Sequence, residues 1–387
     1  MRFSLPFLLT FFITVAAHAQ SFYTGTIQSG GLTREYRVYI PAAYNANKAV
    51  PLLFNLHGYG SNNLEQDFYG NFKPIADTAN FLIVMPNGTY DQQNKRYWNN
   101  FLVSSSVDDV TFISNLLDTM ISKYNIDTNR VYSTGMSNGG FMSYALACGL
   151  SNRIAAIASV TGTMVTPNLN NCTPGRAVPV MQIHGTADNT VPYNGLPVSA
   201  FVPIETLVDT WVNKNGCNTT PIITAVPNNS TTDGCTAERF LYENGIEGST
   251  VEFYKITGGG HTWPGAAINV GVTNQDFSAS FVIWRFLNKY KLNQFTTAAG
   301  EPAQKAAIWN VFPNPAFDQI TLTSPDAAAS LRQVQVYNAL GGLQYQWTGM
   351  NDQILPIDVQ AWPAGVYRLQ LVQSNGARQT STFVCIR

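Results

Sequence analysis

Two hydrophobic patterns alternate along the chain between about residues 34 and 290. Short apolar runs, typical of strands covered on both faces of a parallel sheet, alternate with segments of helical spacing. One such helical segment follows Asp108-Asp109, a pair suited to capping a helix, and 277–290 predicts a final helix. Strands are expected at 36–40, 52–56, 81–85, 131–134, 154–160, 178–183 and 251–256. The alternation predicts an α/β fold with a mostly parallel central sheet flanked by helices.

The pattern changes near residue 294. Residues 296–302 are small and polar, as is typical of a linker. Strand-like pieces then follow at 319–322, 334–337 and 366–372, separated by Pro, Asn and Gly. We therefore expect a linker over 294–307 and a small all-β sandwich over 308–387.

Residues 1–19 are expected to be a signal peptide. Arg2 precedes an almost wholly apolar run from Leu5 to Ala17, and Ala17-His18-Ala19 offers the small residues that a signal peptidase requires. The run is too short to span a bilayer, and no later segment approaches the roughly 20 apolar residues needed. We expect export, no membrane span, and a first folded domain over 20–293.

Charged residues are sparse and balanced. They make up 12% of the chain, and 22 Lys and Arg against 23 Asp and Glu leave a net charge of −1. Proteins that bind nucleic acids usually carry an excess of Lys and Arg, which this sequence lacks, so we expect no nucleic-acid partner. The sequence also has no His-x-x-x-His, no Walker motif and no G-x-G-x-x-G after a strand. We therefore expect no metal and no cofactor.

Gly135-Met136-Ser137-Asn138-Gly139 matches G-x-S-x-G between a predicted strand and the helical run 141–148. A sharp strand-to-helix turn leaves no room for side chains beside the serine, which explains the glycines. It also exposes the serine hydroxyl at a helix N-terminus, where N–H groups stabilise developing negative charge. The alternative is an ordinary glycine-rich turn. We predict that Ser137 is a nucleophile.

A serine nucleophile needs a general base, usually histidine. Without the signal peptide, the chain has three histidines: His57, His184 and His261. In α/β-hydrolases the chain order is serine, then acid, then histidine. This order excludes His57, and it excludes His184 because no Asp or Glu lies between Ser137 and His184. His261, which follows three glycines, is therefore the predicted base.

The acid must lie between the serine and His261. The candidates are Asp188, Glu205, Asp209, Asp233, Glu238, Glu243, Glu247 and Glu252. Asp188 follows the predicted strand 178–183 and so lies at the carboxyl end of the sheet, where such sites form. Its alternative role is a carboxylate that caps a loop. We predict Asp188 as the acid.

Two backbone N–H groups are needed to bind the oxyanion. The loop His57-Gly58-Tyr59 follows the strand 52–56, so the amides of Tyr59 and Asn138 are the predicted donors, and His57 is expected to shape the loop. A surface turn is the alternative. Trp98 and Trp263 lie near these motifs in the sequence and are predicted to bind substrate rings together with the Tyr59 ring, with core packing as the alternative.

Export makes disulfides possible. Cys148, Cys172, Cys217 and Cys235 fall in one region and allow three pairings. We expect sequence neighbours to pair, as Cys148–Cys172 and Cys217–Cys235, which leaves Cys385 over. Zinc binding by thiolates is the weaker alternative, because no Cys-x-x-Cys occurs.

Together these motifs resemble a known family. Residues 22–290 are similar to the secreted esterases that include feruloyl esterases, acetylxylan esterases and polyhydroxybutyrate depolymerases. The matching segments are His57-Gly58, 107–110, 135–140, 184–188 with 191–193, and 260–264. The resemblance implies an α/β-hydrolase, a secreted carboxylic ester hydrolase, with Ser137, Asp188 and His261 as the triad. It also implies oxyanion donors on Tyr59 and Asn138 and paired cysteines in this region.

The C-terminal region resembles the type IX secretion sorting domain of Bacteroidota-like bacteria. The matching parts are 311–316, 336–338 with Gly341-Gly342, and 365–367. The sequence departs from that pattern because it has Arg387 in place of a lysine near the end, and because it carries Cys385. The resemblance implies that the type IX machinery is a partner and that the protein is extracellular or attached to the cell surface.

Feruloyl or acetyl esters of plant cell-wall polysaccharide are the favoured substrates. An exported enzyme with few charges and with aromatic residues near its site suits a neutral polymer. Polyhydroxybutyrate or another polyester is the alternative substrate. A catalytically inactive, carbohydrate-binding surface protein is the alternative from a different class.

Overall fold

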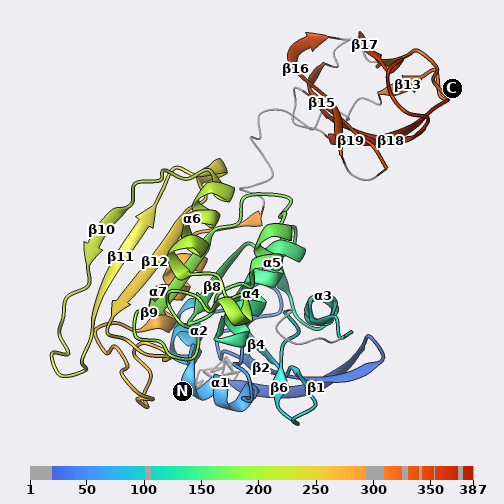
Figure 1. The fold of residues 1–387 in the computed structure, drawn as a ribbon. Coiled ribbons are helices and arrows are strands. Elements are labelled where there is room, and N and C mark those ends of the chain that lie inside the picture. The colour runs from blue at the N-terminus through green and yellow to red at the C-terminus, as the bar shows by residue number, and fades with distance from the viewer. Residues whose placement is uncertain are drawn as a thin grey trace, which may run out of the picture. The chain divides into compact units, whose positions relative to one another are not determined.

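The computed structural model describes residues 20–100, 106–292, 309–324, 330–339, 342–352, 354–373 and 378–386. The chain divides near residue 297 into two units (Figure 1). Each unit has its own apolar core. The predicted signal peptide and the predicted linker lie outside the described residues. Within the described ranges, no helix is both long and apolar enough to cross a membrane.

A ten-stranded sheet runs through the larger unit in the order β1-β2-β4-β3-β7-β8-β9-β12-β11-β10. Its strands are β1 Ser21–Ser29, β2 Leu32–Ile40, β3 Val50–Leu56, β4 Leu82–Pro86, β7 Ile126–Met136, β8 Ala156–Val160, β9 Val180–Gly185, β10 Ile222–Ala225, β11 Thr236–Tyr242 and β12 Val251–Thr257. The central strands, from β4 to β12, are mutually parallel, and antiparallel strands flank them at both edges. This topology confirms the predicted fold class.

The parallel strands are buried on both faces. Every residue of β3, β4, β8 and β9 is buried, which is why continuous apolar runs predicted them. The sequence pattern did not predict β1, β10 and β11. These strands lie at the antiparallel edges, where all four residues of β10 and most residues of β1 are exposed, and polar residues interrupt the apolar ones in each.

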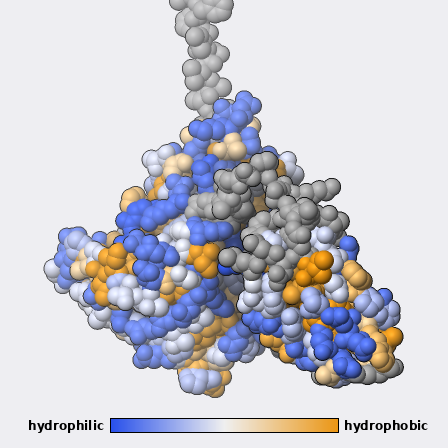
Figure 2. Space-filling model, turned by 90° about the horizontal axis from the view of Figure 1, so that it is seen from above, coloured by the Kyte–Doolittle hydropathy of each residue, from blue (hydrophilic) through white to orange (hydrophobic). Residues whose placement is uncertain are grey.

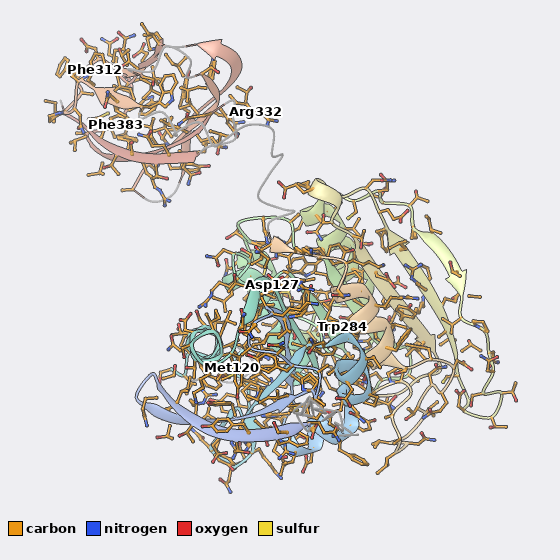
Figure 3. The ribbon with its side chains drawn as sticks, turned by 180° about the vertical axis from the view of Figure 1, so that it is seen from behind. Met120, Asp127, Trp284, Phe312, Arg332 and Phe383 are labelled. Atoms are coloured by element: carbon orange, nitrogen blue, oxygen red, sulfur yellow. A yellow bond between two sulfur atoms is a disulfide. The ribbon has the colours of Figure 1, made fainter. Side chains whose placement is uncertain are left out.

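Helices cover both faces of the sheet (Figure 1). They are α1 Asn63–Tyr69, α2 Lys73–Ala79, α3 Asp109–Lys123, α4 Asn138–Gly149, α5 Thr166–Asn171, α6 Ile204–Asn215 and α7 Ala279–Leu287. Apolar residues of α3, α4 and α6 pack on one face, and those of α2 and α7 pack on the other. Trp284 of α7 (Figure 3) stacks on Phe81 with ring centroids 3.6 Å apart. Asp108 caps α3 as predicted, accepting from the Thr111 N–H at 2.8 Å.

The smaller unit contains two antiparallel sheets around one core. Their strand orders are β13-β14-β17 and β16-β15-β18-β19. The strands are β13 Asn310–Phe312, β14 Gln319–Thr323, β15 Leu331–Tyr337, β16 Leu343–Asp352, β17 Ile354–Asp358, β18 Gly365–Gln373 and β19 Arg378–Cys385. Leu322, Leu369 and Phe383 are among the core residues (Phe383 is labelled in Figure 3). The all-β character predicted for this region is confirmed.

On the face of the molecule shown in Figure 2, hydrophilic residues predominate and hydrophobic ones form separate patches.

One of the two expected disulfides is present. Cys148 and Cys172 are bonded, with Cα atoms 5.2 Å apart, and join the end of α4 to the end of α5. The expected Cys217–Cys235 pair is wrong, because both residues are free thiols. Cys217 contacts Ser249, just before β12, whereas Cys235 lies beside Gly258, just after β12. A strand rises about 3.3 Å per residue, so the length of β12 separates the thiols far beyond disulfide reach.

Thiol counting tests this arrangement. The chain has five cysteines and one disulfide, so three thiols should react with Ellman's reagent in denaturant without reductant. Five should react after reduction. A count of one before reduction would mean that Cys217 and Cys235 pair in the protein after all.

Candidate active site

Ser137 occupies a strained turn between β7 and α4. Its backbone has φ +54° and ψ −120°, in the left-handed half of conformational space that non-glycine residues rarely adopt. A β-carbon on Gly139 would lie 2.2 Å from the Leu56 carbonyl oxygen, and one on Gly135 would lie 2.7 Å from it. Only glycine fits at these two positions. The turn therefore packs directly against the end of β3.

The loop after β3 lies beside this serine. A β-carbon on Gly58 would be 3.5 Å from the Ser137 Cβ. Two backbone hydrogen bonds hold the loop, from Gly60 N–H to the Arg96 carbonyl at 2.8 Å and from Ser61 N–H to the Gly58 carbonyl at 3.2 Å. Among the described residues, neither the Tyr59 N–H nor the Asn138 N–H has an acceptor. Two free N–H groups thus flank Ser137, at the positions predicted for oxyanion donors.

His57 is buried behind the loop and serves as a structural group. Its Nδ1–H donates to the Gly58 carbonyl at 2.7 Å, and its Nε2 accepts from the Gly88 N–H at 2.9 Å. Because both ring nitrogens have partners, the imidazole is neutral and holds one tautomer. Burial lowers the pKa of His57 to about 4, although the Gly58 carbonyl opposes this shift.

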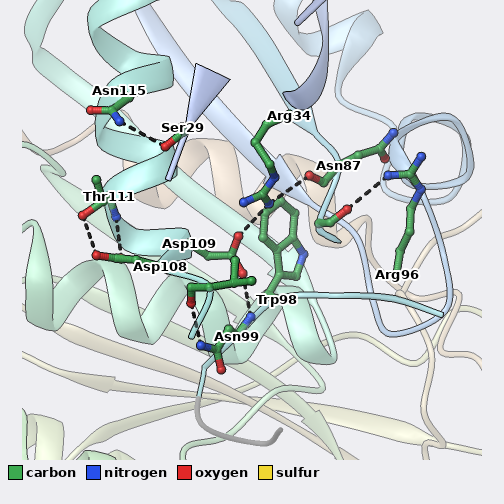
Figure 4. Close-up of polar contacts among 12 residues, drawn as sticks. Ser29, Arg34, Asn87, Arg96, Trp98, Asn99, Asp108, Asp109, Thr111 and Asn115 are labelled. Carbon is green, nitrogen blue, oxygen red and sulfur yellow. Dashed lines mark hydrogen bonds and ion pairs between the residues drawn. The ribbon is translucent and has the colours of Figure 1, made fainter. Parts of the chain in front are cut away.

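A buried ion pair supports the same region (Figure 4). Arg34 of β2 donates to the Asp109 carboxylate at 2.6 Å, and the second oxygen of Asp109 accepts from the Asn99 N–H at 2.7 Å. Burial raises the pKa of Asp109, and Arg34 opposes that rise. One residue before Asn99, the Trp98 N–H donates to the Asn138 Oδ1 at 2.6 Å. The network therefore connects β2 and the start of α3 to the first residue of α4.

The predicted substrate-binding role of Trp98 and Trp263 is wrong. Trp98 is fully buried, and its indole N–H donates to the His57 carbonyl at 2.9 Å. Trp263 is 1% exposed and packs edge-on against Phe72, with its N–H 3.2 Å from the Ser280 hydroxyl. Both indoles fill the core around the site and present no face to a ligand.

Asp188 and His261 meet through a short hydrogen bond. The His261 Nδ1–H donates to Asp188 Oδ2 at 2.7 Å, and Asp188 Oδ1 accepts from the N–H groups of Thr190 and Val191, both at 2.8 Å. Burial by itself raises the pKa of Asp188. Hydrogen bonds from His184 and His261 outweigh that effect, so the pKa lies below its ordinary value. The carboxylate is therefore ionised and fixed in orientation.

Ser137 and His261 line one cleft with a volume of about 600 Å³. Its walls are mainly apolar and come from the loop after β3, from α1 and from the segment after His261. The lining residues are Gly58, Tyr59, Ser61, Leu64, Glu65, Gln66, Phe68, Tyr69, Met136, Ser137, His261, Ile268 and Val270. Sequence reasoning missed the wall from α1, although Leu64 and Phe68 are four residues apart on a short helix with exposed apolar positions. In the part of the chain that the structure describes, no cluster of His, Cys, Asp or Glu could hold a metal.

Comparisons with known proteins agree with this fold. Residues 42–200 match the family described as Phospholipase/Carboxylesterase, and residues 310–386 match the Secretion system C-terminal sorting domain. The chain is 29% identical over 238 residues to Feruloyl esterase B of Piromyces equi, covering 59% of this chain and 42% of that protein. It is 32% identical over 169 residues to the Bifunctional acetylxylan esterase/xylanase XynS20E of Neocallimastix patriciarum, covering 42% of this chain and 22% of that protein.

Further relatives are esterases by name. Feruloyl esterase D of Neurospora crassa is 31% identical over 207 residues, covering 50% of this chain and 64% of that protein. The chain thus spans less than two thirds of these three relatives' own length. The solved structure of an acetyl xylan esterase from Aspergillus awamori aligns with a TM-score of 0.48 at 14% identity, covering 69% of this chain and 99% of that one.

Residues 42–200 therefore match the phospholipase/carboxylesterase family, and the larger unit, an α/β-hydrolase, resembles feruloyl and acetylxylan esterases. Residues 310–386 are a secretion-system sorting domain. A domain of this kind assigns the protein to the outside of the cell or to its surface.

The neutral state of His57 predicts how stability depends on pH. The unfolded chain binds a proton at this histidine near pH 6.5, whereas the folded protein does so only near pH 4. The contribution of His57 is thus complete above pH 6.5 and is lost as the pH falls towards 4, a difference of roughly 3 kcal/mol. Urea unfolding between pH 7 and 4 should show this loss. His57→Gln should flatten the pH dependence, and an unchanged slope would contradict the assignment.

Proposed function

We propose that the protein is a carboxylic ester hydrolase in which Ser137, His261 and Asp188 form the catalytic triad. One observation carries the proposal: His261 donates to Asp188 at 2.7 Å and lines the same cleft as Ser137. Among the described residues, the other ring nitrogen of His261 has no partner and is available to accept a proton. This is the arrangement that activates a serine hydroxyl.

The reaction proceeds in two acyl-transfer steps. Ser137 Oγ attacks the ester carbonyl, His261 Nε2 takes its proton, and the tetrahedral oxyanion lies between the Tyr59 and Asn138 amides. His261 then protonates the departing alcohol, which leaves an acyl-enzyme. Water, deprotonated by His261, attacks this ester and releases the acid. The ionised Asp188 stabilises the imidazolium formed in both steps.

The cleft favours a large, uncharged acyl group. A volume of about 600 Å³ far exceeds the needs of an acetyl group, and Leu64, Phe68, Ile268 and Val270 line it. The Tyr59 ring is held at the mouth by a hydrogen bond to Asp91. These features support a feruloyl-type ester, carried on plant-wall polysaccharide, as the substrate. The sorting domain would deliver the enzyme to such polymers through the type IX machinery.

A polyester is the second candidate substrate. Leu64 and Phe68 on α1, with Ile268 and Val270 across the cleft, are each more than half exposed and apolar. A solid polyester would contact such a rim as well as a phenolic acyl group would. Two assays distinguish the candidate substrates: kcat/KM for methyl ferulate, and the rate of hydroxybutyrate release from polymer film. We expect efficient hydrolysis of methyl ferulate and slow release from the film.

Removing the nucleophile tests the activity itself. Ser137→Ala should lower kcat for methyl ferulate by about 10⁴-fold or more, because no other group can form the acyl-enzyme. Ser61→Ala is the matched control, since Ser61 lines the same cleft and its hydroxyl donates only to Glu65. The control should stay within a few-fold of the wild type. Turnover in Ser137→Ala comparable to that of an active wild type would refute the triad. Absence of turnover in the wild type itself would favour an inactive binding protein.

Truncating the cleft wall tests the substrate assignment. Phe68→Ala should raise KM for methyl ferulate by about 10-fold and leave hydrolysis of a small acetyl ester nearly unchanged, since the lost contact is apolar area. Phe281→Ala is the control, because Phe281 is equally exposed (57% against 56%) but does not line the cleft. Equal effects on the two esters would argue against an acyl-binding role for α1.

A further inference from the structure

A buried row of polar side chains ends on Asp188. The Tyr144 hydroxyl donates to Gln182 Oε1 at 2.8 Å, and Gln182 Nε2 donates to His184 Nδ1 at 3.0 Å. His184 Nε2 then lies 3.4 Å from Asp188 Oδ2. Tyr144, Gln182 and His184 are fully buried inside the parallel sheet and its covering helix. Buried polar groups lower stability unless each finds a partner, so an apolar core would otherwise be expected here.

The partners of the row fix the hydrogen-bonding direction of every member. Gln182 Nε2 also donates to the Gly162 carbonyl at 2.8 Å, while its Oε1 accepts from Tyr144, so the amide has only one orientation. Its NH₂ group therefore faces His184 Nδ1, which must accept. The proton of the His184 ring is consequently on Nε2.

That single N–H donates to the loop that carries the acid. His184 Nε2 donates to the Val191 carbonyl at 2.8 Å, and the same nitrogen lies 3.4 Å from Asp188 Oδ2. Val191 in turn donates its own N–H to Asp188 Oδ1 at 2.8 Å. The imidazole thus links β9, through Val191, to the short loop that carries Asp188.

We propose that His184 is a positioning residue for the triad: its Nε2–H, oriented by Gln182, donates to the Val191 carbonyl and so holds the loop that keeps the Asp188 carboxylate in line with His261. The inference rests on the proposed roles of Asp188 and His261. Those roles need a carboxylate fixed to within a fraction of an ångström, because misplacement of about 1 Å can cost on the order of 10²-fold in rate. His184 touches no substrate and exchanges no proton in the reaction.

Two substitutions separate positioning from mere packing. His184→Met fills similar volume but offers no donor, whereas the amide of His184→Gln can place an N–H near the original Nε2. We expect kcat to fall by about 10- to 100-fold in His184→Met with KM within about twofold, and to return to within about threefold of the wild type in His184→Gln. Each kcat is referred to active sites counted by fluorophosphonate titration, and unfolding temperatures are measured alongside.

The outcomes are distinct. His184→Met with unchanged kcat per active site would overturn the proposal, as would equal losses in the Met and Gln variants. If His184→Met does not fold, His184→Asn replaces it, because the shorter Asn side chain places its amide near the original Nδ1 position and short of Nε2. His184→Asn should then have a lower kcat than His184→Gln, and equal kcat values would reject the proposal. A wild-type protein that fails to react with fluorophosphonate would refute the triad itself, which is a separate result.

Discussion

The whole site depends on one close approach, between the end of β3 and the start of α4. Gly139 lacks a side chain, and any β-carbon there would lie 2.2 Å from the Leu56 carbonyl oxygen. The turn that makes this contact holds Ser137 in its left-handed conformation, and the loop at Gly58 lies beside it. The same turn thus places the hydroxyl beside the Tyr59 and Asn138 N–H groups, for which the described part of the chain provides no acceptor. The strain at Ser137 is tolerated because the parallel sheet fixes both neighbouring segments.

Buried polar groups hold the two halves of the site from behind. His57 ties the loop after β3 to Gly88, and the Arg34–Asp109 pair connects to Asn138 through Trp98 and Asn99. On the other side, Asp188 accepts hydrogen bonds from backbone and imidazole donors. Such groups stabilise little in themselves, since burial offsets much of each interaction. Their contribution is to specify one geometry.

The sequence predicted the features that follow from chain order and from continuous patterns. The parallel strands carry unbroken apolar runs, and chain order alone brought Asp188 and His261 together as a predicted pair. Features set by three-dimensional distance were not predictable. Cys217 and Cys235 are near in sequence but lie at opposite ends of β12. Trp98 and Trp263 are near the motifs in sequence, yet packing buries their rings, and the cleft wall comes from the short helix α1 instead.

A crystal structure of the protein after reaction with a fluorophosphonate tests the central claim most directly. The phosphorus should be bonded to Ser137 Oγ, and its oxygen should lie within about 2.7–3.1 Å of both the Tyr59 and Asn138 amide nitrogens. His261 Nε2 should face the same adduct while its Nδ1 stays on Asp188. An adduct on another residue, or a phosphoryl oxygen turned away from both amides, would contradict this account.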